Sequence, residues 1–130
     1  MHPRVETYIE SADPRHAQML YAVRQAIVDA HPAICEKFIY STPFYALFSN
    51  FCYLTFSKKH QCFVLGFMQG YLMEDPYSLL RADSNQKYIR HIFLNAASLE
   101  QLHIIHEYLQ LAVQLQAEKK MKKGPRLPRK

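Results

Sequence analysis

The sequence of 130 residues has only three glycines and no tryptophan. Neither of the two common glycine-rich phosphate-binding patterns, GxGxxG and GxxxxGK[S/T], occurs in it. Long apolar runs are also missing, because the longest, Cys62–Met68, has seven residues, whereas a membrane-spanning helix needs about 20. The first ten residues, "MHPRVETYIE", are polar and lack the apolar region of a secretion signal. These absences predict a soluble, cytoplasmic protein with no membrane segment.

Cysteine is scarce as well. The three cysteines, Cys35, Cys52 and Cys62, are odd in number and form no CxxC motif. This pattern is typical of free thiols in a reducing compartment, where cysteine acts as a small apolar core residue. We therefore expect three buried cysteines and no disulfide.

The net charge of +5 is distributed unevenly. Residues 118–130 carry seven Lys or Arg and one Glu, whereas residues 1–117 carry nine Lys or Arg and ten Asp or Glu. We therefore predict a nearly neutral domain over 1–117 and a basic, disordered tail over 118–130. Nucleic acid binding is expected only through phosphate contacts of this tail.

Apolar periodicity predicts the fold. Residues recurring at helical spacing predict a short helix over 3–11, with Asp13 as the cap of a second helix that ends near 31, and a last helix from Ser98. Between them, β-branched and aromatic runs predict strands near 36–41, 44–48, 51–57, 60–67 and 88–94. The sequence therefore predicts a single α+β domain, with an antiparallel sheet of about five strands packed against N- and C-terminal helices.

The hairpin around Lys58-Lys59 predicts which residues share a face of this sheet. A tight turn at these two lysines pairs position 54 with 63. Alternation then places one set of residues on each face: Cys52, Leu54, Phe56, Phe63 and Leu65 on the first, and Phe51, Tyr53, Thr55, Cys62 and Val64 on the second. The second face is apolar, so we expect it to be covered. The alternatives are the loop over 70–86, the N-terminal helix, a second copy in a homodimer, or a ligand.

Two groups of cationic or titratable residues are candidates for contact with a ligand. Lys58, Lys59 and His60 are explained by a solvated turn, with an anion site as the alternative. Arg90 lies in the last predicted strand, where an arginine is typically paired, at an edge, or in contact with a ligand.

Four stretches occur in a recognisable order: "YIESADPRHAQMLYAVRQAI", "EKFIYSTPFYALF", "FSKKHQCFVLGFMQGYLM" and "KYIRHIFLNAASLEQLHIIHEYLQLA". Over residues 5–117 this order resembles the YdhG-like family, a bacterial domain of unknown function. Some members of that family are described as frataxin-like intracellular iron chaperones. The resemblance implies an α+β fold and no catalysis, and it favours a role for the Phe-x-Lys-Lys-His hairpin beyond that of a turn.

These observations lead to one main interpretation and three alternatives. We expect a small, non-enzymatic binding domain for a metal or a small anionic ligand, without a resident cofactor. Its cleft is predicted among Tyr40, Pro43, Phe44, Lys59, His60 and Arg90. The first alternative is an iron chaperone, with iron held by Glu6, Glu10, Asp13, Glu74 and Asp75. The second is nucleic acid binding by the tail. An enzyme comes last, because no nucleophile–base pair is visible.

Overall fold

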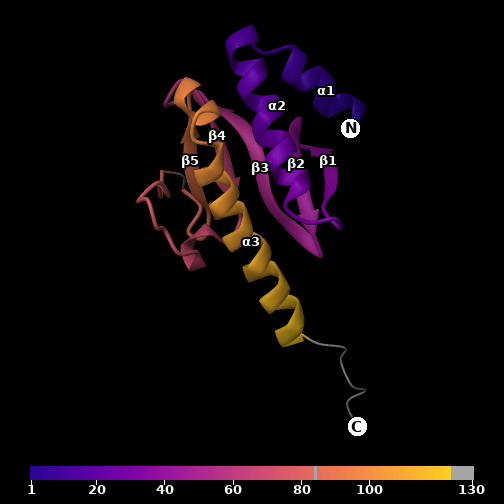
Figure 1. Cartoon of the computed structure of the whole chain (residues 1–130), viewed down its shortest axis with the longest axis vertical. Helices are drawn as coiled ribbons and strands as arrows, with labels where there is room; N and C mark the ends of the chain where they lie inside the picture. The colour runs from indigo at the N-terminus through magenta and orange to yellow at the C-terminus, as the bar shows by residue number, and fades with distance from the viewer. Residues whose placement is uncertain (84, 124–130) are drawn as a thin grey trace.

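The computed structural model describes residues 1–83 and 85–123, with side chains up to Met121. These residues form the helices α1 (Pro3–Glu10), α2 (Pro14–Asp29) and α3 (Leu102–Lys123), the short 3-10 helices η1 (Gly70–Leu72) and η2 (Ala96–Leu99), and the strands β1 (Cys35–Ile39), β2 (Thr42–Leu47), β3 (Ser49–Ser57), β4 (Cys62–Phe67) and β5 (Arg90–Leu94). The sheet is antiparallel, with the strands in sequence order. All three α-helices lie on one face of it (Figure 1). The predicted α+β domain with five strands is confirmed.

Proline and a capping side chain start both N-terminal helices. Pro3 and Pro14 occupy their first turns, where the missing N–H costs no hydrogen bond. As predicted, Asp13 caps α2, because its Oδ1 accepts a hydrogen bond of 2.9 Å from the backbone N–H of Arg15. Within the described part of the chain, no helix combines the length and the apolar character that crossing a bilayer would require.

The hairpin between β3 and β4 differs from its prediction. Leu54 pairs with Leu65, and Ser57 with Cys62, so the predicted register is wrong by two residues. The turn has four residues instead of two, with Gln61 at a φ of 53° and its side chain donating a hydrogen bond of 2.6 Å to the carbonyl of Lys58. A two-residue turn favours Asn or Gly, because it needs positive φ, and Lys58-Lys59 offers neither. Since the error is an even number of residues, it leaves the predicted faces of the hairpin residues from Cys52 onward unchanged.

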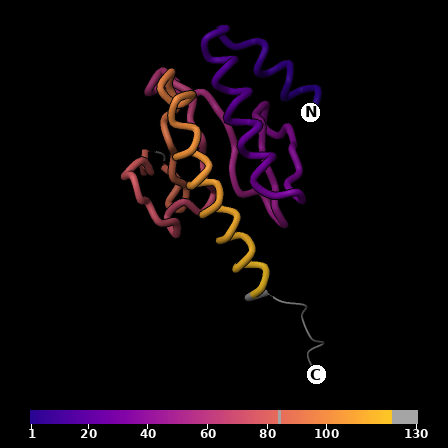
Figure 2. The backbone as a smooth tube through the Cα atoms, in the orientation of Figure 1, coloured from indigo at the N-terminus to yellow at the C-terminus, as the bar shows by residue number. Residues whose placement is uncertain are grey.

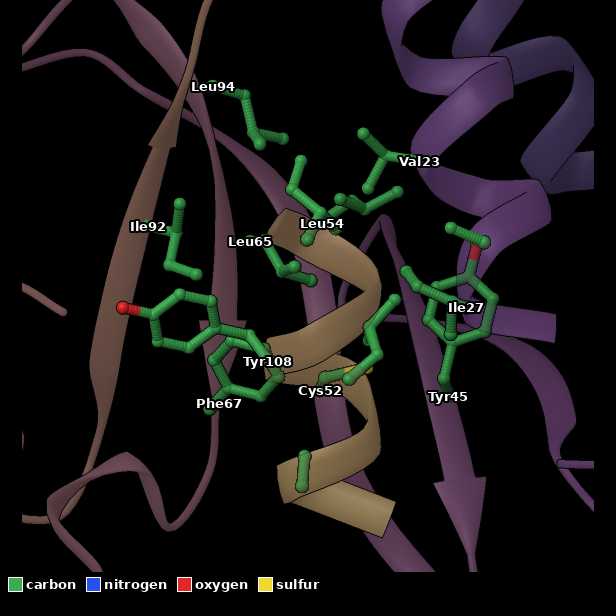
Figure 3. Packing of buried hydrophobic residues seen from close by; sticks show 14 of the residues in the cluster. Val23, Ile27, Tyr45, Cys52, Leu54, Leu65, Phe67, Ile92, Leu94 and Tyr108 are labelled. Atoms are coloured by element: carbon green, nitrogen blue, oxygen red, sulfur yellow. The ribbon is translucent and has the colours of Figure 1, made fainter. Parts of the chain in front are cut away.

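The helix-facing side of the sheet forms the core. Figure 3 shows Leu54, Leu65 and Ile92 of the sheet packed against helix residues that include Val23 and Tyr108, and all five are almost fully buried. The expectation that Phe51 lies on the second face is wrong. Tyr45 pairs with Cys52 and Ala46 with Asn50, which leaves Phe51 as the extra residue of a β-bulge. Its side chain, only 4% exposed, joins the core.

The cysteines are free, as predicted, but they are not all buried. Cys52 is in the core, Cys62 is half-buried on the second face, and Cys35 at the start of β1 is exposed. Burial raises the pKa of the Cys52 thiol well above its usual value, so this side chain stays neutral.

Helix α3 runs past the end of the sheet (Figure 2). It is anchored by Gln116, whose Nε2 donates a hydrogen bond of 2.7 Å to the carbonyl of Leu47. Further along, the ammonium group of Lys120 lies 4.2 Å from the centre of the Phe48 ring. The predicted tail over 118–130 therefore begins inside α3, which ends at Lys123. Residues 124–130 lie outside the described residues, and nucleic acid binding by the tail stays a prediction.

One buried ion pair joins both N-terminal helices to the sheet. Arg24 of α2 donates two hydrogen bonds, of 2.7 and 3.1 Å, to the carboxylate of Glu36 in β1. The same carboxylate accepts from the backbone N–H of His2 at 2.8 Å and from the hydroxyl of Tyr45 at 3.0 Å. Burial on its own would raise the pKa of Glu36, but these hydrogen bonds and the charge of Arg24 outweigh burial and lower it.

Replacing Glu36 with Gln should therefore destabilise the fold by about 3 kcal/mol, because it leaves Arg24 buried without its counter-charge.

The lowered pKa of Glu36 also predicts that the stability of the protein depends on pH. The stability contributed by ionised Glu36 is present above the unfolded pKa of 4.5 and is lost as the pH falls through the lower folded value. The free energy of unfolding, measured with urea at pH 7 and in acid, should therefore fall less on acidification in Glu36→Gln than in the wild type. The matched control is Glu10→Gln, an exposed carboxylate, and an equal effect there would contradict the prediction.

Candidate functional site

The sheet face opposite the helices, called the open face from here on, carries one row of paired residues that crosses all five strands. Directly paired residues of antiparallel strands point to the same side of the sheet. This row continues past β5, because Arg81 forms two backbone hydrogen bonds with His91, of 2.8 and 2.9 Å. Its members are, in order, Lys37, Phe44, Tyr53, Gly66, His91 and Arg81.

Gly66 makes room for the ring of Tyr53. A Cβ atom at Gly66 would lie 2.6 Å from Cε1 of Tyr53, far inside contact distance, so the ring rests directly on the glycine. Phe44 stacks against the Tyr53 ring at a centroid distance of 5.2 Å. Held in this way, the hydroxyl of Tyr53 reaches across β4 to His91 and lies 2.6 Å from its Nε2.

Asp83 extends this contact into a network. Its Oδ1 lies 2.6 Å from Nδ1 of His91, and its Oδ2 lies 3.2 Å from Nε2 of His60 in the β3–β4 turn. The side chain of His91 is 11% exposed and that of Asp83 is 15% exposed. Nε2 of His60 is itself buried and makes no hydrogen bond within the described residues, so its contact with Asp83 is one of distance only. We call Tyr53, His91, Asp83 and His60 the open-face network.

The protons of this network can be assigned from its chemistry. Burial raises the pKa of Tyr53 to about 12, and the negative charge of Asp83 adds to the effect. Tyr53 is therefore a neutral phenol at physiological pH. In the His91 tautomer that carries its proton on Nδ1, that N–H donates a hydrogen bond to the carboxylate of Asp83, and Nε2 accepts one from the hydroxyl of Tyr53. The result is a phenol, an imidazole and a carboxylate linked in series.

Four of the six predicted ligand-binding residues belong to the open face or border it. Phe44 is part of the row, and His60 belongs to the network. Tyr40, in the β1–β2 turn, is 88% exposed, and its ring lies 6.3 Å from that of Phe44. Lys59 is exposed beside His60 in the β3–β4 turn.

Pro43 and Arg90 are not on this face. Each neighbours a residue of the row, Phe44 and His91 respectively, and strand alternation turns it to the helix-facing side. The guanidinium of Arg90 donates hydrogen bonds to the backbone carbonyls of Lys87, at 3.1 Å, and Ile89, at 2.9 Å. Arg90 therefore supports the turn into β5 rather than the open face.

The five carboxylates predicted for iron do not form one site, since no group of three or more His, Cys, Asp or Glu in the described residues is arranged to hold a metal ion. Asp13 caps α2, as described above, and Glu10 accepts a hydrogen bond of 3.2 Å from Tyr21. Asp75 accepts from the hydroxyl of Tyr108 and from the backbone N–H groups of Leu79 and Leu80. The remaining two, Glu6 and Glu74, lie in α1 and in the segment after η1. The iron chaperone alternative stays a prediction.

Sequence reasoning did not select three members of the network: Tyr53, Asp83 and His91. The alternation of β3 did place Tyr53 on the second face. His91 would have followed from the β4–β5 register, in which it pairs with Gly66. No periodic pattern indicates Asp83, because it lies in the long connection before β5.

Comparison with protein families, with characterised proteins and with solved structures finds no significant match to this chain.

The contact between Gly66 and Tyr53 gives a direct test of this geometry. Gly66→Ala should destabilise the protein by about 1–3 kcal/mol, because the new methyl group displaces the Tyr53 ring. In a Tyr53→Ser background the same substitution should cost less than about 0.5 kcal/mol, since the ring is gone. Urea unfolding of the four proteins measures both values. Equal costs in the two backgrounds would show that the ring does not rest on Gly66.

Proposed function

We propose that this chain is a binding domain for a small anion, a molecule bearing a phosphate or carboxylate group, held on the open face beside Tyr53 and His91. The observation that carries the proposal is the imbalance of charge there. Arg81 pairs with His91, and Lys58 and Lys59 precede His60 in its turn, whereas Asp83 is the single carboxylate of the network and already contacts two histidines.

The strands themselves are consistent with this imbalance. Glu36 is their only acidic residue, and it lies on the helix-facing side, paired with Arg24. On the open face, Lys37 begins the row and Arg81 ends it. An anion approaching this face therefore meets no carboxylate of the strands.

Arg81 is the strongest candidate for direct contact. It is exposed, and within the described residues no hydrogen bond or ion pair engages its guanidinium. Its backbone is fixed by the pairing with His91, so its side chain starts from the same face as the network. A guanidinium binds phosphate or carboxylate through two parallel hydrogen bonds, which are stronger than those between neutral groups.

Aromatic rings of the protein beside the network indicate which group the bound anion should carry. Phe44 and Tyr53 are stacked on each other and only half-buried, and the ring of Phe93 lies 4.6 Å from that of His60. Flat, partly exposed rings bind planar groups through their faces. We therefore expect an anion attached to an aromatic group to bind more tightly than the free anion.

Calorimetric titration with phenyl phosphate and with inorganic phosphate tests the proposal. We expect saturable binding of phenyl phosphate, weaker binding of inorganic phosphate, and a dissociation constant for phenyl phosphate at least about 10-fold higher in Arg81→Ala, because a charge-assisted hydrogen bond contributes about 1.5–3 kcal/mol. Lys59→Ala should weaken binding less, since its ammonium sits at the exposed turn.

The matched control is Arg4→Ala, which removes the same charge from an exposed position of α1, on the other side of the sheet. An equal loss of affinity in Arg4→Ala would mean that the overall charge, not the open face, binds the anion. Absence of saturable binding to the wild-type protein would refute the proposal itself.

A further inference from the structure

Three members of the open-face network have the arrangement of an activated nucleophile. A hydroxyl lies 2.6 Å from one nitrogen of an imidazole, and a carboxylate lies 2.6 Å from the other nitrogen. In this order a hydroxyl nucleophile, a general base and an orienting carboxylate occur in unrelated hydrolases. Here the groups are Tyr53, His91 and Asp83, and they come from β3, β5 and the segment between Arg81 and β5.

We infer that Tyr53 is a nucleophile that accepts a phosphoryl group from a phosphate ester bound on the open face, with His91 as its base. This inference rests on the proposed function, because the same anion site must hold the ester. Tyr53 and His91 are then catalytic residues, and Asp83 is a positioning residue that keeps the His91 proton on Nδ1.

The step balances without a further reactant. The Tyr53 oxygen attacks phosphorus as its proton passes to Nε2 of His91. A bond forms between phosphorus and the tyrosine oxygen, and the bond between phosphorus and the leaving oxygen breaks. The leaving group departs with the bonding electron pair, and the proton on Nε2 of His91 passes to it or to bulk water, which leaves His91 neutral. Neutral His91 then deprotonates a water molecule, whose oxygen attacks phosphorus. The bond between phosphorus and the Tyr53 oxygen breaks, inorganic phosphate is released, and the Tyr53 oxygen recovers its proton from His91.

The surroundings fit this chemistry. Transfer of a phosphoryl group develops negative charge on its oxygens, and a guanidinium stabilises that charge. Arg81 starts from the position directly opposite His91. The alternative nucleophile on this face, Cys62, makes no hydrogen bond to an imidazole within the described residues, so no base is placed to take its proton.

A purely structural role explains less. The segment of Arg81 is already fixed to β5 by two backbone hydrogen bonds, so the side chains of the network are not required to attach it. Taking a phenol, an imidazole and a carboxylate partly out of water is costly relative to apolar side chains of the same size. Burying the polar groups of the network therefore costs free energy that anchoring the segment does not require.

The experiment uses the full chain and p-nitrophenyl phosphate. We expect release of nitrophenolate and a phosphoryl group on Tyr53, located by mass spectrometry of peptides from the quenched reaction. Tyr53→Phe should form no adduct. His91→Gln and Asp83→Asn should slow adduct formation on the order of 100-fold. Arg4→Ala should react as the wild type does.

The outcomes separate this inference from the anion site. Binding of phenyl phosphate without any adduct on Tyr53 would overturn the nucleophile and leave the anion site standing. Nitrophenolate release that persists in Tyr53→Phe would also overturn it. Absence of both binding and reaction would remove both proposals. The adduct is sought in the wild-type protein, so the result does not depend on the folding of any variant.

Discussion

The turn formed by residues 58–61 sets the register of β3 against β4, and every placement on the open face depends on that register. With Ser57 opposite Cys62, Gly66 falls beside Tyr53 on one side and His91 on the other. A slip of one residue would turn Tyr53 into the core and bring an apolar side chain to the open face. A slip of two would keep the faces but move Gly66 away from the Tyr53 ring. The network exists only because both conditions are met.

Much of the architecture was predictable, because it follows from periodic patterns. Helical spacing located α1 and α2, and two-residue alternation assigned Leu54 and Tyr53 to opposite faces despite the wrong turn. The prediction failed for Phe51, because a bulge adds one residue at a single point and leaves no periodic signal. It failed for the turn itself, because four-residue turns lack a dipeptide as diagnostic as Asn-Gly.

The site was less predictable, for a related reason. It needs two registers at once, β3 with β4 and β4 with β5, together with the path of the segment that carries Arg81 and Asp83. The sequence pointed to Arg90 as the ligand-binding residue of β5, whereas the residue of β5 that belongs to the network is its neighbour, His91. One position decides the face of a strand residue, and the ends of a predicted strand are uncertain by at least that much.

The carboxylates of Glu36 and Asp83 differ in the groups that contact them, and only the surroundings of Asp83 fit the proposed reaction. Glu36 accepts hydrogen bonds from Arg24, Tyr45 and a backbone N–H, donors that keep their protons throughout the neutral range. Asp83 is held instead by two histidines, and imidazole is the side chain that gains and loses a proton near neutral pH. One of those imidazoles, that of His91, lies between Asp83 and the phenol of Tyr53. Glu36 instead accepts a hydrogen bond directly from the phenol of Tyr45, with no imidazole between them. The Glu36 cluster therefore holds the helices on the sheet, whereas the Asp83 cluster has the order of groups that the proposed proton transfer needs.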